Sequence, residues 1–394
     1  MKDILLKRIF LLFCLCFAFL SLCWGDVYHT QAESFTAQQE LNENIFEQLG
    51  NLDLDALQEY VQGLQGFSDE TVVERLYRYI QGEGFDFEGF GRQFLAIIAG
   101  NIQELLPAFS CITAITLLCG ILSTLKSNFL SDTTADVVFM VAYIGALIPV
   151  LAVLTECFSS VKGSVTSIRE QMQIVFPIML TLMAASGGAV SVAIYRPAVA
   201  FLSNTLVSLI DVAVLPITLT VIAFSMAGNL FSDLKIGRFT SFFKSINKWI
   251  MGVGVSVFGV FFTVQGITSA TYDGIARRAA KYAIGTGVPI VGGFLSSGFD
   301  LAIAGSTLIK NSLGTMSVFM LLAVIAEPLF LLIAVNLLLR LTSAVTQPFG
   351  SGKISDFLAE TADNLNYCLA GLLFTAFLYF VSILLIVCST EAFF

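Results

Sequence analysis

Charged side chains are scarce in this chain, and their scarcity excludes an ordinary water-soluble protein. Only 12% of the 394 residues are Asp, Glu, Lys or Arg, whereas 56% are hydrophobic. Soluble domains carry about 25% charged residues, so a fold of this size has too few charges to cover its surface in water. The composition therefore predicts a protein whose surface lies largely in lipid.

Histidine and paired cysteines are also lacking, and these absences exclude most metal and catalytic chemistry. The chain has one histidine, His29, so an HExxH zinc protease is impossible. None of its eight cysteines forms a CxxC pair or another spacing typical of a zinc site or a disulfide framework. We expect no metal, no cofactor and no catalytic residue.

Phosphate and nucleic-acid binding are disfavoured as well. The run Phe349–Lys353 resembles a phosphate loop, but it lacks the first glycine and the final Ser/Thr of that motif. The net charge is −9, and no Lys/Arg run offers a stripe for a phosphate backbone. The GxGD pattern of intramembrane aspartyl proteases is not met at Asp273 or Asp300. The sequence therefore predicts a protein that is not an enzyme.

The N-terminus has the features of a secretory signal. Lys2, Lys7 and Arg8 precede a short apolar stretch, which predicts a signal peptide over 1–25. An uncleaved anchor and a lipidated Cys23 are the alternatives. The acidic segment 26–94 follows, and we expect it outside the cytoplasm, with amphipathic helices over 53–64 and 69–80, the second opened by a Ser-Asp-Glu cap.

The body, 95–394, is predicted to be an all-α bundle of transmembrane helices. Apolar windows recur over 105–125, 137–157, 174–195, 197–227, 249–271, 284–306, 314–340 and 367–389. Proline and glycine predict broken or re-entrant helices that line a path. The candidates for such breaks are Pro177, Gly187, Gly188, Pro216, Pro289, Gly292, Gly293 and Pro328. For the Gly-rich stretch Gly285–Gly298, a closely packed helix face is the alternative.

Two parts of the body resemble each other, which suggests an internal duplication over 137–248 and 249–366. Lys235-Ile236 followed by Phe239 matches Lys353-Ile354 followed by Phe357. Charge counts place 228–248 in the cytoplasm and 350–366 outside, which would make the repeats inverted. The basic linker 272–283 also prefers the cytoplasm and conflicts with this count, so the topology stays open.

Charges inside the apolar windows are the sharpest functional signal, because each costs about 2.5–3.5 kcal/mol at a helix centre. Asp211 and Glu327 lie near the middle of their windows, each shortly before a proline. They are either contacts for an ion, a proton or a polar substrate, or structural partners of Arg196, Arg340, Asn204, Asn336 or the backbone freed by the prolines. Further candidates lie nearer ends or breaks: Glu156, Arg196, Asp300, Lys310 and Arg340.

Two Gly/Pro-rich blocks and the residues near them have a recognisable pattern: Phe176-Pro177-Ile178, Leu182–Gly187, Arg196-Pro197-Ala198, Asp273-Gly274, Arg277, Ala280-Lys281, Gly285, Pro289–Gly293, Asp300 and Lys310-Asn311. This pattern resembles the stage III sporulation protein AE family of endospore-forming bacteria. The resemblance covers about 95–390 and includes the order of leader, acidic segment and multi-span body.

The resemblance implies a role in sporulation. Members of this family lie in the mother-cell membrane around the forespore, with the other stage III sporulation proteins AA to AH and, opposite them, stage II sporulation protein Q. It implies a permease- or gate-like subunit of a channel or secretion-like complex that supports late forespore development. A free-standing proton- or ion-coupled transporter and a non-conducting scaffold are the alternatives.

Overall fold

The computed structural model describes residues 35–64, 70–82, 87–129, 132–230, 236–260, 263, 292–349 and 352–388. Within these ranges every regular element is a helix, and no strand occurs. The signal peptide, His29 and Pro289 lie outside the described residues. The expected all-α fold class is confirmed.

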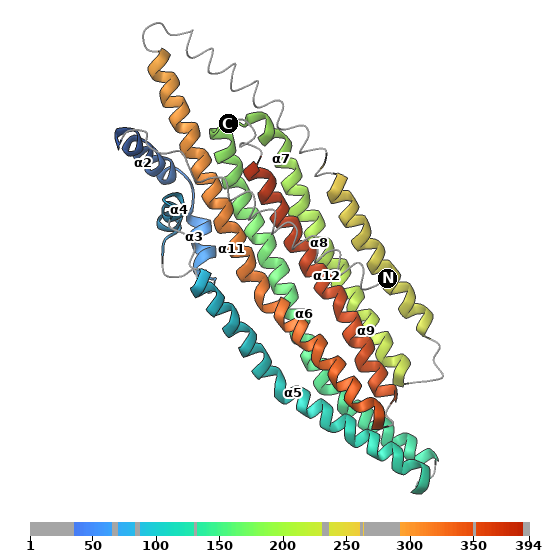
Figure 1. Ribbon diagram of the computed structural model, residues 1–394. Coiled ribbons are helices and arrows are strands. Elements are labelled where there is room, and N and C mark those ends of the chain that lie inside the picture. Colours follow the sequence, from blue (N-terminus) through green and yellow to red (C-terminus); the bar gives the residue numbers. More distant parts are fainter. Residues whose placement is uncertain are drawn as a thin grey trace.

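Long helices form an elongated bundle (Figure 1). In chain order they are α5 (Phe87–Phe129), α6 (Asp132–Ala185), a continuous helical segment 189–230, helical residues 237–260, α11 (Gly292–Thr346) and α12 (Gly352–Cys388). At 1.5 Å per residue α6 and α11 are each about 80 Å long, far more than the ~30 Å hydrocarbon core of a bilayer. Each of them therefore extends well beyond one membrane crossing.

The windows 137–157 and 174–195 do not form two separate spans. Residues 132–185 form the single helix α6, which runs through Pro149 and Pro177. A turn at 186–188 follows, and Gly187 adopts a positive φ of 87°. This conformation favours glycine, so the expected break lies at Gly187 and Gly188 rather than at Pro177.

The segment 189–230 is irregular where polar residues occur. It comprises α7 (Ala189–Phe201), η1 (Leu202–Leu206), α8 (Val207–Leu209), η2 (Ile210–Val214) and α9 (Leu215–Leu230). Both η segments are π-helical and contain Asn204 and Asp211, respectively. α9 continues through Pro216 and α11 through Pro328, so neither proline breaks its helix.

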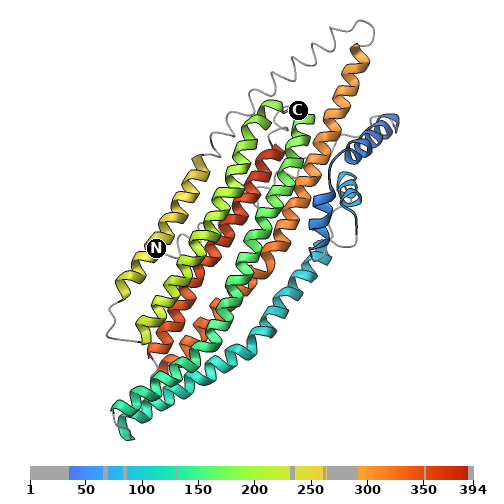
Figure 2. The ribbon, with the colours of Figure 1, turned by 180° about the vertical axis from the view of Figure 1, so that it is seen from behind.

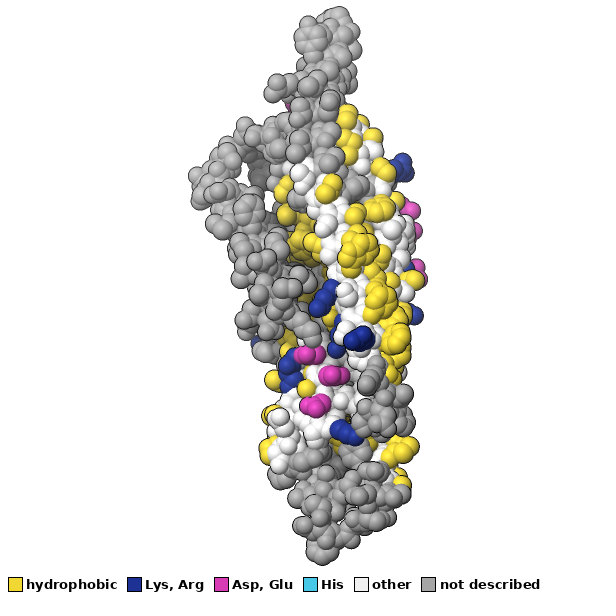
Figure 3. Space-filling view, turned by 90° about the vertical axis from the view of Figure 1, so that its right-hand side faces the viewer, with side chains coloured by type: hydrophobic (Ala, Val, Ile, Leu, Met, Phe, Trp, Pro, Cys, Tyr) yellow, Lys and Arg dark blue, Asp and Glu magenta, His cyan; other side chains and the backbone are white. Residues whose placement is uncertain are grey.

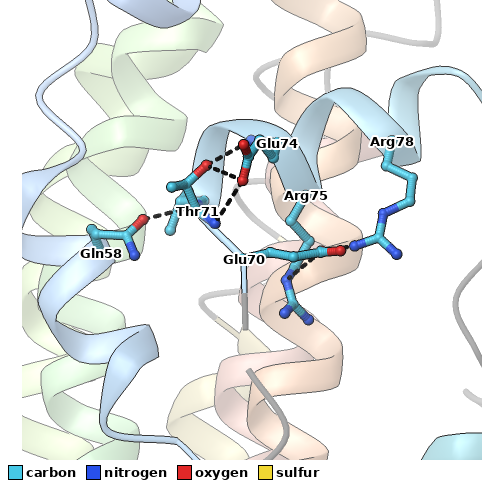
Figure 4. Close-up of polar contacts among 7 residues, drawn as sticks. Gln58, Glu70, Thr71, Glu74, Arg75 and Arg78 are labelled. Atoms are coloured by element: carbon cyan, nitrogen blue, oxygen red, sulfur yellow. Dashed lines mark hydrogen bonds and ion pairs between the residues drawn. The ribbon is translucent and has the colours of Figure 1, made fainter. Parts of the chain in front are cut away.

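Three short helices pack on one side of the bundle (Figures 1 and 2): α2 (Phe35–Gly50), α3 (Asp55–Gln62) and α4 (Val72–Ile80). The helices expected over 53–64 and 69–80 are confirmed as α3 and α4, whereas α2 was not expected. The predicted Ser-Asp-Glu cap is wrong. Thr71 caps α4 instead, because its side chain accepts from the Glu74 backbone N–H and Glu74 accepts from Thr71 in return (Figure 4).

The same short helices contact the long ones through polar side chains. Gln48 Nε2 donates to Ala302 O at 3.1 Å, and Ser306 Oγ donates to Gln48 Oε1 at 2.7 Å. Tyr60 Oη donates to Ser167 O on α6 at 3.1 Å. Burial raises the pKa of Tyr60. The acidic segment is therefore docked on α6 and on the first half of α11.

The last turn of α9 and the first turns of α12 lie at the same end of the bundle (Figure 1). α9 ends at Leu230, α12 begins at Gly352, and Asn229 Nδ2 is 3.4 Å from Glu360 Oε2. The charge counts that placed 228–248 and 350–366 on opposite sides are therefore wrong. The acids Asp356, Glu360 and Asp363 misled these counts, because they belong to helix α12 rather than to a loop.

Candidate functional site

A polar network joins α9, α11 and α12. Arg340 Nε donates to Asn336 Oδ1 at 2.9 Å, and Arg340 Nη2 is 2.7 Å from Asp363 Oδ1. Asn336 Nδ2 also donates to Asn366 Oδ1 at 3.3 Å. Arg340 is thus held by two neighbours that orient its guanidinium toward α12.

The network continues from α12 to α9. Asn229 Nδ2 donates to Glu360 Oε2, and Asn364 Nδ2 donates to Ser225 Oγ, each at 3.4 Å. The buried atoms Asn364 Oδ1 and Tyr367 Oη have no hydrogen-bond partner among the described residues. Buried polar atoms usually find a protein or water partner, so these two atoms are hydrogen-bonding groups that the described contacts leave unused.

The polar network lies beside an apolar surface on the same stretch of α11. Ile333, Leu337 and Leu341 are exposed, while Asn336 and Arg340 take part in the network. One face of this stretch therefore suits lipid and another carries hydrogen-bonding groups. Seen from the side in Figure 3, charged side chains of both signs gather in the lower half, below a strip of hydrophobic ones.

Asp211 has a partner that the sequence interpretation missed. Lys162 Nζ on α6 is 4.0 Å from Asp211 Oδ1. Two more polar pairs follow along the same two segments, Arg169 with Ser208 at 3.4 Å and Gln173 with Asn204 at 3.1 Å. None of the partners proposed for Asp211 from the sequence is the one found next to it.

Glu327 lies level with Asp211, although on another helix. Ser164 Oγ donates to Val324 O at 3.1 Å and Gln171 Nε2 to Ser317 O at 3.0 Å, which aligns α6 and α11 in antiparallel fashion. By this alignment Glu327 is level with Lys162. The structure therefore brings both acids to one level, but Glu327 is exposed rather than inside the bundle.

Lys310 is fully buried. Its Nζ donates to Ile386 O at 3.2 Å and to Val387 O at 2.9 Å, in the last turn of α12. The carbonyl groups at a helix C-terminus lack intrahelical partners and carry partial negative charge. Lys310 therefore caps α12, which is a structural use of a charge that the sequence offered as a functional candidate.

The remaining charged candidates lie on three different helices. Glu156, Arg196 and Asp300 are exposed, on α6, α7 and α11 respectively. Gly292 and Gly293 begin α11. Among the described residues no group of three or more His, Cys, Asp or Glu side chains could hold a metal ion.

The fold defines a class before any relative is considered. Four described helices are long and apolar enough to cross a membrane: 143–185, 189–229, 300–346 and 352–388. Together with the composition, they define a multi-pass helical membrane protein.

The chain belongs to the stage III sporulation protein AE family, whose family model matches residues 71–390. A similar curated relative is the stage III sporulation protein AE of Bacillus subtilis (strain 168). It is 25% identical over 332 residues, which cover 84% of this chain and 79% of that protein. No solved structure matches the chain.

Proposed function

We propose that this chain is a permease- or gate-like membrane subunit of the complex that links mother cell and forespore during sporulation. It acts there without catalysis, in the mother-cell membrane around the forespore, together with other stage III sporulation proteins and stage II sporulation protein Q. The family membership supports the sporulation role, and the helices support the membrane location.

The observation that carries the passage role is the polar network between α9, α11 and α12. Two of its residues, Asn336 and Arg340, lie on the stretch of α11 that also exposes Ile333, Leu337 and Leu341. Polar and charged groups at such a depth are costly against lipid and generally face a protein interior or water. Arg340 and Asp363 are 49% and 39% exposed in the single chain, so this face is turned toward the interior of the assembly.

The experiment replaces Arg340 by Gln and Asp363 by Asn, singly and together, in a sporulating host. Late forespore gene expression is scored together with the amount of the protein in the membrane. Glu170→Gln, on the exposed polar face of α6, is the matched control. We expect normal amounts of each protein, with expression lost only in the network variants.

Two results would contradict the proposal and point to the alternatives. Normal expression in the double variant at normal abundance would favour a scaffold. Ion or proton flux through vesicles that contain the purified chain alone, lost on Asp211→Asn, would favour a free-standing transporter that uses the Lys162–Asp211 pair.

A further inference from the structure

The exposed face of α6 changes character once along its length. Val141, Ile148 and Leu151 are 66%, 67% and 42% exposed. From Thr155 to Thr181, where the burial of every residue is described, no large hydrophobic side chain of α6 is exposed. The exposed residues there include Thr155, Glu156, Ser159, Lys162, Glu170, Gln173 and Thr181.

The two helices packed against this part of α6 show the same change. On α11 Glu327 is exposed, and the next exposed residues are Ile333 and Leu337, at 45% and 65%. On α5 Gln103 and Glu104 are exposed, and exposed hydrophobic side chains follow at Leu106, Leu118 and Ile121.

These three changes occur at one level of the bundle. The Ser164–Val324 hydrogen bond aligns Ile333 of α11 with Thr155 of α6, since the two helices are antiparallel. Thr113 Oγ1 of α5 is 3.3 Å from Thr342 Oγ1 of α11. Because α5 and α11 run in the same direction (Figure 1), this contact aligns Glu104 with Ile333.

Below that level exposed hydrophobic residues occur on all three helices, and we name these residues together the apolar belt. It comprises the exposed hydrophobic side chains of 106–121 on α5, 137–151 on α6 and 333–345 on α11. Each stretch is about 20–24 Å long at 1.5 Å per residue. This length approaches the ~30 Å of a bilayer's hydrocarbon core.

We propose that the apolar belt contacts the hydrocarbon of the bilayer, and that the exposed face of α6 above it lies outside the hydrocarbon, in contact with water. The part outside the hydrocarbon includes α6 from Thr155 onward, the first half of α11, and α2–α4. The polar contacts of Gln48 and Tyr60 with α11 and α6 lie in this part, where water is available to polar side chains.

The placement changes the interpretation of the charges found in the apolar windows. Glu156, Lys162, Asp211 and Glu327 lie just above the belt, at the level of the lipid headgroups and the water beyond. Their charges therefore escape the insertion cost of the hydrocarbon centre. The Arg340–Asp363 pair does not belong to the belt, because it joins α11 to α12 and not to α5 or α6.

The experiment introduces single tryptophans into the full chain with Trp24 and Trp249 replaced by Phe. Val141→Trp and Leu337→Trp place the indole on the belt. Ser159→Trp and Glu170→Trp place it on the exposed polar face of α6. Each protein is reconstituted into phosphatidylcholine vesicles with or without bromine on the acyl chains, and its helix content is checked by circular dichroism.

We expect brominated lipid to quench the tryptophans introduced at positions 141 and 337 several-fold more strongly than those introduced at 159 and 170. Equal quenching at all four positions would mean that hydrocarbon also covers the upper half, and would overturn the proposal. Weak quenching at all four would mean that protein covers the belt, and would overturn it too. If a variant on the belt loses helix content, Ile148→Trp replaces it. If a variant on the polar face of α6 loses helix content, Thr155→Trp replaces it.

Discussion

The two halves of α6 share a buried face and differ in their exposed face. Val150, Leu154, Val161, Val165, Ile168 and Met172 are buried along the whole helix. Below Thr155 the outer side chains are hydrophobic, and above it they are polar. The comparison teaches that a continuous apolar core does not mark how far a membrane reaches, whereas the outward side chains do.

The largest expected effect separates the halves directly. Val141→Lys places a charge on the apolar belt and should cost about 2.5–3.5 kcal/mol of membrane insertion. Ser159→Lys, on the same helix above the belt, should change stability by no more than about 0.5 kcal/mol. The amount of protein in the membrane measures both, and equal losses in the two variants would break the comparison.

A second prediction concerns close packing in the upper half. A Cβ on Gly314 would lie 2.6 Å from Val387 Cγ2, so Gly314→Leu overpacks the contact between α11 and α12. We expect a loss of about 1–3 kcal/mol, measured by equilibrium unfolding in detergent. Gly163→Ala is the matched control: nothing lies within 4 Å of its Cβ, and it should stabilise by about 0.4–1 kcal/mol.

Lys310→Met should have a somewhat smaller effect. It removes the two hydrogen bonds that Nζ donates to Ile386 O and Val387 O. Hydrogen bonds to charged groups contribute about 1.5–3 kcal/mol, and methionine recovers part of this by avoiding the desolvation of an amine. We expect a net loss of about 1–2 kcal/mol and faster amide exchange in the last turn of α12. Unchanged exchange there would contradict the capping role.

The smallest expected effect lies in the docked segment. Thr71→Ala removes the cap of α4, which should cost about 1 kcal/mol of local helix stability. Hydrogen bonds from the Thr71 side chain and backbone lower the pKa of Glu74. The contribution of Glu74 is therefore present above the unfolded pKa and is lost as pH falls through the lower folded value.

Amide exchange of α4 measured from neutral to acidic pH checks this pH dependence. Protection should decrease on acidification in the native chain and depend less on pH in Glu74→Gln. An identical pH profile in both proteins would show that Glu74 does not titrate with the cap.

The sequence was sufficient to predict helices and a membrane location, but not the length of each helix. The hydropathy dip between 157 and 174 suggested a break, yet α6 is continuous there. Lys162, Arg169 and Glu170 lower the mean hydropathy of a helix whose buried face is unbroken. The break at Gly187 was predictable, because positive φ favours glycine, whereas Pro328 fits inside α11.

The candidate site was predictable only in part. Arg340 and Asn336 were singled out, and they do interact. Their partner Asp363 was assigned to a polar linker, because a charge near the end of an apolar window does not show whether the helix has already begun. Lys162 was missed for the same reason. Pairings between residues more than about 20 positions apart depend on helix alignment, which periodicity does not provide. The suggested duplication over 137–248 and 249–366 stays a prediction.

The most direct test of the account uses a water-side probe on α6. Ile148→Cys and Ser159→Cys, each in a chain without other cysteines, are treated in vesicles with a membrane-impermeant maleimide that reaches both faces. The account predicts rapid labelling at 159, and labelling at 148 only after detergent is added. Labelling at 148 without detergent, or none at 159, would contradict the claim that hydrocarbon covers the outer face of α6 only below Thr155.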